Sequence, residues 1–282
     1  EVYYDMKKEG YKIIDNKNQI YVNIAADGSL LLHDGKHRLT FAKLLGIKKI
    51  PVGVSFIHKN QTQIITSNDK EIIQKVLTMM QYTKKSNAPY KAKEFESGYH
   101  SIKLKNAYFR GQRENNVRLQ NVSYNFKDKV VLDLGCNVGG MLHIIANEIK
   151  CGIGVDYNPK CINAANLIKE YNQTKNLQFY TFNFDEEDIS LVKNFILDKK
   201  VDICFLLSIC VWIKKWKELI RFAVTIADTL LFEANGTPRQ QEEQVKFLNI
   251  IYESVNLIDN NSIDDPVHKR KLYFCKKYET NY

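Results

Sequence analysis

Two glycines and an acid in the second half of the sequence stand where ligand-binding chemistry would need them. Residues 130–134 are an apolar, β-branched run that carries Asp133, and Gly135 and Gly139 follow with Asn137 between them. Glycine is needed where a strand turns sharply into a helix, because a ligand can then approach the backbone without meeting a Cβ atom. A pyrophosphate-binding turn would read G-x-G-x-x-G, and Asn137 takes the place of its middle glycine, which disfavours dinucleotide binding.

A second acid stands at the end of the next apolar run. Asp156 closes the sequence Gly-Val-Asp, which follows a stretch of helical character. An acid at the tip of the second strand can accept hydrogen bonds from both ribose hydroxyls of an adenosine. The glycine turn and Asp156 together therefore predict a pocket for an adenosyl group at the carboxyl ends of neighbouring strands.

The elements that must position these residues alternate along the second half of the chain. Short apolar runs separated by amphipathic stretches predict an α/β fold, a doubly wound parallel sheet with helices on both faces. The expected strands are 130–134, 152–156, 177–181, 202–207 and 229–233, with helices at about 139–149, 159–172, 187–198, 214–226 and 239–253. A hairpin-like pair, 255–258 and 271–275, is expected to complete seven strands.

The segment Asp133-Leu-Gly-Cys-Asn-Val-Gly139 resembles the first motif of class I S-adenosylmethionine-dependent methyltransferases, and the resemblance extends over about residues 125–278. It implies a Rossmann-like fold and S-adenosyl-L-methionine (SAM) as the cofactor. In this family an acid or amide after the third strand accepts from the adenine amino group beside an apolar residue that packs on the ring. The expected cofactor-binding residues are Asp133, Gly135, Asn137, Gly139, Asp156, Tyr157, Phe184, Asp185 and Ser208.

The end of the fourth strand is expected to form the acceptor side of the pocket. Relatives that act on small molecules or on tRNA wobble uridine often show Ser-x-x-x-His here, whereas this chain has Ser208 followed by Trp212 in the histidine position. Trp212 is therefore either a substrate platform or a core aromatic residue. The sequence also lacks an Asn-Pro-Pro-Tyr-type tetrapeptide, which disfavours methylation of a base amino group.

Residues upstream of the first strand are expected to cap the pocket. By resemblance to relatives with such a cap, Tyr99, His100 and Arg113 are expected to close over the cofactor or the substrate, with Tyr99 a substrate contact and Arg113 available to the cofactor carboxylate or an acidic acceptor. The alternative for His100 is a polar surface residue on a helix. A sulfonium methyl needs little activation, so catalysis would come mainly from holding acceptor and methyl in line. A hydroxyl acceptor would also need a base, for which His100 and Glu233 are the candidates, although Glu233 could equally be a loop charge.

The N-terminal region has a different pattern. Strands are expected at 20–24, 30–32 and 50–56, with a turn at Asp27–Gly28 and a helix at 37–45. Residues 32–52 are similar to the signature of the ParB/sulfiredoxin-like fold. The resemblance covers about residues 1–58 and implies phosphate binding by Gly35, His37 and Arg38.

This N-terminal signature also departs from its relatives. Lys36 stands where sulfiredoxin has cysteine, and the Glu-Arg-Arg run of partition ParB proteins is missing, so neither of those chemistries is carried over. His33 and His37 would need a continuous helix to share a metal, and Gly35 interrupts it, so no metal is expected.

Composition and charge set the remaining expectations. Residues 1–125 hold 21 Lys and Arg against 11 Asp and Glu, whereas residues 126–282 hold 20 against 21. The basic N-terminal part could attract nucleic acid, nucleotide phosphates or an acidic glycan, or be a solvated surface. Six cysteines without a CxxC pair disfavour a zinc site or a disulfide framework and indicate a cytoplasmic protein, and the longest mostly apolar run, 204–213, is too short for a membrane span.

These observations predict a three-part chain. A ParB/sulfiredoxin-like module (1–60) and a helical connector and pocket cap (61–124), with one helix at 70–81, precede the methyltransferase domain (125–282). The expected reaction is methyl transfer to an oxygen or nitrogen of a polar small molecule, nucleotide-linked sugar or glycan precursor. An RNA- or DNA-modifying methyltransferase is the alternative. A non-enzymatic cofactor sensor is disfavoured because both adenosine-binding acids are present. The sequence does not determine the oligomeric state.

Overall fold

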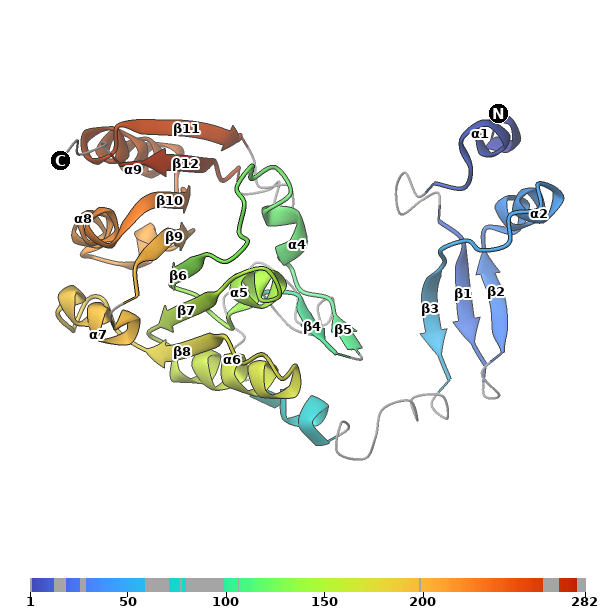
Figure 1. Cartoon of the computed structure of the whole chain (residues 1–282), viewed down its shortest axis with the longest axis horizontal. Helices are drawn as coiled ribbons and strands as arrows, with labels where there is room; N and C mark the ends of the chain where they lie inside the picture. Colours follow the sequence, from blue (N-terminus) through green and yellow to red (C-terminus); the bar gives the residue numbers. More distant parts are fainter. Residues whose placement is uncertain are drawn as a thin grey trace. The chain divides into compact units, whose positions relative to one another are not determined.

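The computed structural model describes residues 2–12, 19–25, 29–58, 71–76, 78–79, 99–105, 107–197, 199–260 and 269–277. The chain divides into two compact units, Glu1–Lys70 and Glu71–Tyr282 (Figure 1). Each unit has its own sheet.

The second unit is built on a mainly parallel sheet, which has seven strands in the described part of the chain. Its order is β11-β12-β10-β9-β6-β7-β8. The strands are β6 (Val130–Leu134), β7 (Cys151–Asp156), β8 (Leu177–Thr181), β9 (Val201–Leu207), β10 (Ala227–Glu233), β11 (Ser254–Asp259) and β12 (Leu272–Lys276). Only β12 pairs antiparallel, with β10 and β11, so the predicted doubly wound sheet with its closing pair is confirmed.

Helices cover both faces of this sheet, as Figure 1 shows. They are α5 (Gly140–Ile145), α6 (Pro159–Tyr171), α7 (Lys193–Ile196), α8 (Trp216–Ile226) and α9 (Pro238–Ile251), with 3-10 turns at Ile189–Val192 and Cys210–Trp212. The helix expected at 187–198 is thus a 3-10 turn followed by a short α-helix. It ends at Leu197, whose φ of 55° is incompatible with helix.

Strand residues divide between two cores. Leu132 packs with residues of α8 and α9 on one face, while Val131 packs with residues of α5 and α6 on the other. Because both faces are buried, the strands consist of nearly continuous apolar runs rather than alternating ones. All six cysteines are buried and free.

The chain order creates a crevice at the carboxyl edge of the sheet. From β6 the chain runs outward through β7 and β8, then returns to β9 on the other side of β6. Ligands of doubly wound sheets bind outside the carboxyl ends of the strands at such a reversal. The site is therefore expected above β6, between β7 and β9.

The segment before β6 adds a small hairpin and a short helix. The hairpin pairs β4 (Ile102–Leu104) with β5 (Ala107–Phe109), and α4 (Asn115–Arg118) follows. Residues 71–76 and 78–79, within the helix expected at 70–81, are helical. Ile102 and Leu104 pack with residues of α6, so this segment shares a core with the methyltransferase region. The division at residue 124 stays a prediction.

The first unit contains a small sheet of order β2-β1-β3 in its described residues. The strands are β1 (Tyr21–Ile24), β2 (Leu30–Asp34) and β3 (Gly53–Ile57), with helices α1 (Val2–Glu9) and α2 (Lys36–Leu44). β1 pairs antiparallel with β2 and parallel with β3. The expected α+β pattern agrees with these elements, α1 was not anticipated, and the turn predicted at Asp27–Gly28 lies outside the described residues.

Candidate cofactor and acceptor site

The glycine turn after β6 has the backbone that the sequence predicts. Gly135 and Gly139 have φ of +85° and +71°, in the left-handed region that favours glycine. A Cβ on Gly135 would lie 2.7 Å from the Ile209 side chain, and one on Gly139 would lie 2.4 Å from the Phe179 ring. The turn is therefore closely packed, and both positions require glycine.

Asp156 at the tip of β7 is joined directly to this turn. Its Oδ2 accepts from the Asn137 backbone N–H at 2.9 Å, and its Oδ1 accepts from the Asn158 N–H at 2.9 Å. The carboxylate thus fixes the start of α6 and the glycine turn together. Tyr157, the next residue, is 58% exposed beside it.

Asp133 is a buried acid of the crevice with one carboxylate oxygen unsatisfied by the described residues. It is 1% exposed, and its Oδ2 has no hydrogen-bond partner among the described residues. Burial raises the pKa of this carboxyl to about 7; the Arg118 charge lowers it and the Asp156 charge raises it. A buried acid with a vacant acceptor suits a cationic amine ligand, which would stabilise its ionised form.

The third expected cofactor contact lies after β8. Phe184 is buried in the core, with its ring centroid 5.5 Å from that of Phe182. Asp185 is partly exposed and its Oδ1 accepts from the Lys215 N–H at 3.1 Å. Both residues thus occupy the carboxyl edge of the sheet, and their adenine-binding roles stay predictions.

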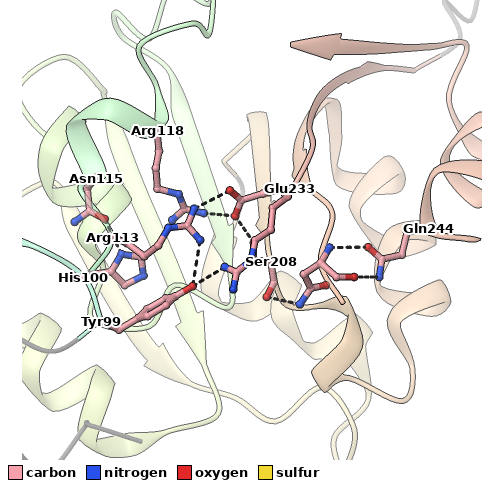
Figure 2. A network of polar contacts seen from close by, with 10 residues as sticks. Tyr99, His100, Arg113, Asn115, Arg118, Ser208, Glu233 and Gln244 are labelled. Atoms are coloured by element: carbon pink, nitrogen blue, oxygen red, sulfur yellow. Dashed lines mark hydrogen bonds and ion pairs between the residues drawn. The ribbon is translucent and has the colours of Figure 1, made fainter. Parts of the chain in front are cut away.

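The other half of the edge holds a buried polar network (Figure 2). Glu233, at the end of β10, is 2% exposed. Its Oε1 accepts from Arg113 Nη2 at 2.8 Å, and its Oε2 accepts from Arg118 Nη2 at 2.6 Å and from Ser208 Oγ. One carboxylate therefore ties the segment before β6 to the ends of β9 and β10.

Tyr99 extends this network. Its hydroxyl oxygen accepts from Arg113 Nη1 at 3.3 Å and from Arg270 Nη1 at 2.9 Å. Arg113 is completely buried, so it lies beneath the surface of the crevice. The structure brings Tyr99, Arg113, Ser208 and Glu233 together as one cluster, and the roles assigned to them stay predictions.

The two base candidates differ in environment. His100 is buried on a bridge with Arg113, so the alternative of a surface residue on a helix is wrong. Its Nδ1 lies 2.6 Å from Asn115 Oδ1, and burial, with the Arg118 charge, lowers its pKa to about 3. His100 is thus a neutral and weak base near pH 7. Glu233 holds two guanidinium groups, and this geometry favours anchoring over proton transfer.

Trp212 ends the 3-10 turn that follows β9. It is 72% exposed, so its interpretation as a core aromatic residue is wrong. Ser208, at the start of the same loop, has φ of +62°, which is unusual for a residue other than glycine. An exposed indole at the carboxyl end of a central strand fits the substrate platform expected there.

Several residues of the network were not singled out from the sequence. They are Asn115, Arg118, Asn235, Gln244 and Arg270. The arginines carry no local signal, because their partners lie more than a hundred positions away in the chain. Asn235 could have been found, since it follows the end of a strand at the same edge as Ser208.

In the first unit the turn before α2 has the expected backbone. Gly35 has φ of +92°, and a Cβ there would lie 2.8 Å from Ile20 Cα. Asp34 Oδ1 accepts from the Gly35 N–H at 2.6 Å, Arg38 Nη1 donates to Gln19 O at 3.4 Å, and His37 is exposed. Phosphate binding here stays a prediction.

Metal sites and membrane spans were also searched. Within the described residues, no group of three or more His, Cys, Asp or Glu side chains could hold a metal ion. Of the helices that the structure describes, none has both the length and the apolar character to cross a bilayer.

Comparison with known proteins identifies the class. Residues 125–256 match the family model described as a methyltransferase domain. No curated protein matches the sequence. The match and the fold together show that residues 125–256 are a class I SAM-dependent methyltransferase domain. Domains of this kind use SAM as their cofactor.

Solved structures support the fold. The N-terminal domain of EvdMO1 with S-adenosylhomocysteine (SAH) bound is similar with a TM-score of 0.51 and 8% identity over 73% of this chain and 97% of that domain. The structure of the same domain in the presence of SAH and D-fucose has a TM-score of 0.50 and 8% identity, over 73% of this chain and 97% of that domain. Against EvdMO1 itself the TM-score is 0.50 at 8% identity over 73% of this chain, which spans only 47% of the length of EvdMO1.

The crevice fits SAM on its own geometry. Asp133 offers a buried, vacant carboxylate oxygen that suits the ammonium group of a methionine. Gly135 and Gly139 give the turn its left-handed backbone, with Ile209 and Phe179 packed beside them. Asp156 places a carboxylate at the strand tip where ribose hydroxyls are bound in folds of this kind.

Proposed function

We propose that this enzyme transfers the methyl group of SAM to an oxygen or nitrogen of a polar small molecule, nucleotide-linked sugar or glycan precursor. The observation that carries the acceptor class is Trp212, 72% exposed at the carboxyl end of β9. An indole face stacks on the apolar face of a sugar ring or on a nucleobase. The N-terminal domain of EvdMO1, a fold neighbour, has been crystallised in the presence of SAH and D-fucose. By analogy, we propose a sugar-type acceptor for this chain.

In this proposal the described residues bind and orient the two reactants. Asp156 and Asp185 hold the adenosyl group, Phe184 packs beside the adenine, and Asp133 takes the amino group of the methionine part. SAM supplies an electrophilic methyl on a sulfonium. The protein's contribution is alignment at the carboxyl edge of β6 and β9 and exclusion of water. If the acceptor is a hydroxyl, His100 and Glu233 remain the candidate proton acceptors, although burial lowers the pKa of His100 and Glu233 is already paired with Arg113 and Arg118.

The proposal predicts where radiolabelled methyl from SAM will appear. The full chain should label nucleotide-linked sugars in a panel that also contains free sugars and tRNA. Trp212→Ala should reduce labelling of the sugar acceptor while leaving SAH affinity unchanged, because the indole lies on the acceptor side. Labelling of tRNA alone, or equal labelling by the wild type and by Trp212→Ala, would contradict the proposed acceptor site.

We propose that the N-terminal unit binds a nucleotide phosphate. We propose a ParB/sulfiredoxin-like module over residues 1–60, with 61–124 as connector and cap, and phosphate contacts from Gly35, His37 and Arg38. The open N-terminus of α2 beside Arg38 supports this role. Binding of a nucleoside diphosphate to the full chain should be lost in Arg38→Ala and retained in Lys43→Ala, a basic residue at the other end of α2.

A second candidate is a nucleic-acid methyltransferase, favoured by the basic N-terminal part. Residues 1–125 carry 21 basic against 11 acidic residues. Backbone phosphate binding would weaken steeply as salt rises. A salt series of tRNA and duplex DNA binding therefore separates the candidates. An affinity that hardly changes with salt would rule out the nucleic-acid methyltransferase.

The six free, buried cysteines are consistent with the cytoplasm as the proposed location.

A further inference from the structure

We infer that Asn235 and Gln244 are positioning residues of the acceptor site. They hold the loop Ser208–Trp212, named here the acceptor loop, in the conformation that presents Trp212 and covers the cofactor turn. This inference rests on the proposed function, because it assumes that the acceptor is bound at this loop. Neither residue contacts the acceptor in the proposal; both act through the loop backbone.

The acceptor loop starts in a backbone conformation that needs support. Ser208 has φ of +62°, and side chains other than glycine, asparagine and aspartate rarely adopt this region. Its backbone N–H donates to Glu233 O at 2.9 Å. Its carbonyl accepts a hydrogen bond from a side chain outside the loop.

Asn235 supplies the contacts at both ends of the turn. Its Nδ2 donates to Ser208 O at 2.7 Å, and its Oδ1 accepts from the Val211 N–H at 3.3 Å. The side chain is 3% exposed. A single amide thus satisfies a buried acceptor and a donor of the loop, and losing either leaves a polar group unpaired.

Gln244 fixes Asn235 in turn. Its Oε1 accepts from the Asn235 backbone N–H at 3.1 Å, and its Nε2 donates to Asn235 O at 2.9 Å. Gln244 lies on α9, which starts with a capping box at Thr237 and Gln240. Figure 2 shows Gln244, Ser208 and Glu233 in this network, and Asn235 links the first two. A rigid helix therefore sets the place of the loop.

The loop reaches both parts of the site. Ile209 packs against the glycine turn, since a Cβ on Gly135 would lie 2.7 Å from its side chain. Trp212, at the other end, is 72% exposed. A displacement of the acceptor loop would therefore change SAH binding through Ile209 and acceptor binding through Trp212.

The same helix offers a matched control. Gln241 is also buried, at 7% exposure, and its Nε2 donates to Gly236 O at 3.1 Å. Among the described residues, the only side-chain hydrogen bond of Gln241 goes to Gly236 O and not to the acceptor loop. Gln244→Glu and Gln241→Glu therefore each remove one amide-to-carbonyl hydrogen bond from α9, but only the first affects Asn235.

The experiment uses Trp212 as its own reporter. The sequence has two tryptophans, so Trp216→Phe leaves Trp212 as the single source of tryptophan emission. In this background, Asn235→Asp keeps the acceptor for Val211 but puts a carboxylate oxygen against the Ser208 carbonyl. We expect lower Trp212 anisotropy and SAH affinity reduced about tenfold, as expected for an unpaired buried group. Gln244→Glu should give the same changes at smaller size, and Gln241→Glu neither.

A rescue separates positioning from general damage. Glycine adopts a φ near +60° unaided, so Ser208→Gly should recover part of the Trp212 anisotropy that Asn235→Ala loses. The inference is overturned if Asn235→Asp leaves anisotropy unchanged, or if Gln241→Glu matches Gln244→Glu. Anisotropy of the ligand-free protein tests the positioning even if the wild type fails to bind SAH, which would instead defeat the assignment of the cofactor site.

Discussion

The two halves of the carboxyl edge are built in different ways. At β6 and β7 the site is made of backbone: a turn with two left-handed glycines, which Asp156 holds by accepting from the Asn137 N–H. At β9 and β10 it is made of side chains, in which Glu233 joins Arg113, Arg118 and Ser208. The first half is shaped for a ligand to lie close to the chain. The second half is held by buried charge, so substitutions there should damage stability before they change cofactor contacts.

The largest expected effect comes from removing the shared carboxylate. Glu233→Ala leaves the Arg113 and Arg118 guanidinium groups without this buried partner, which should lower the free energy of unfolding by about 3–5 kcal/mol. Urea unfolding of the full chain, followed in the second unit by Trp216 emission, measures it. Glu243→Ala, which breaks an exposed pair with Lys217, should cost far less because solvent screens that pair. Equal losses in the two variants would contradict the comparison.

The next effect tests the backbone half. Gly139→Ala introduces a Cβ at φ of +71°, 2.4 Å from the Phe179 ring, so the turn must shift. Overpacking of this kind costs about 1–3 kcal/mol, and SAH affinity should fall with it. Gly46→Ala is the control: Gly46 has φ of +68°, and a Cβ there would meet no atom within 4 Å. This substitution therefore introduces backbone strain without overpacking. SAH affinity measured by calorimetry should be unchanged in that control; an undiminished affinity in Gly139→Ala would show that the turn does not hold the cofactor.

A smaller effect should appear in the pH dependence of binding. Burial raises the pKa of Asp133 to about 7, and an ammonium ligand binds its ionised form. Below pH 7 the Asp133 carboxyl must therefore lose its proton when SAH binds. SAH affinity should then fall about tenfold for each pH unit below 7. Affinity should level off above 7. Asp133→Asn should bind more weakly and lose this slope, and a slope that survives the substitution would assign the proton to another group.

The smallest effect belongs to Trp212. Because its side chain is 72% exposed, Trp212→Ala should change the free energy of unfolding by at most about 0.5 kcal/mol. Trp216→Phe, on the packed face of α8, is the matched aromatic substitution and should cost more. A large loss of stability in Trp212→Ala would make the residue part of the fold rather than part of the acceptor site.

The same contrast explains what could be predicted from the sequence. The seven strands follow from apolar runs that the sequence shows directly, and the cofactor half depends on contacts such as Asn137 with Asp156, which are 19 positions apart. The charge network depends on pairs such as Arg113 with Glu233 and Arg270 with Tyr99, 120 and 171 positions apart. Arg113 and Glu233 were both singled out, but nothing in the sequence indicates that they pair. The sequence also could not decide whether His100 lies on the surface or Trp212 lies in the core. Both questions were answered only by the burial of these side chains in the structure.

The central claim is that the edge of β6 and β7 binds the adenosyl group. Isothermal titration of SAH into the full chain and into Asp156→Ala tests it directly, with Asp188→Ala, an exposed acid that caps a 3-10 turn, as control. The wild type and Asp188→Ala should bind SAH with equal affinity, and Asp156→Ala should show no measurable heat of binding. Unchanged affinity in Asp156→Ala would contradict the account.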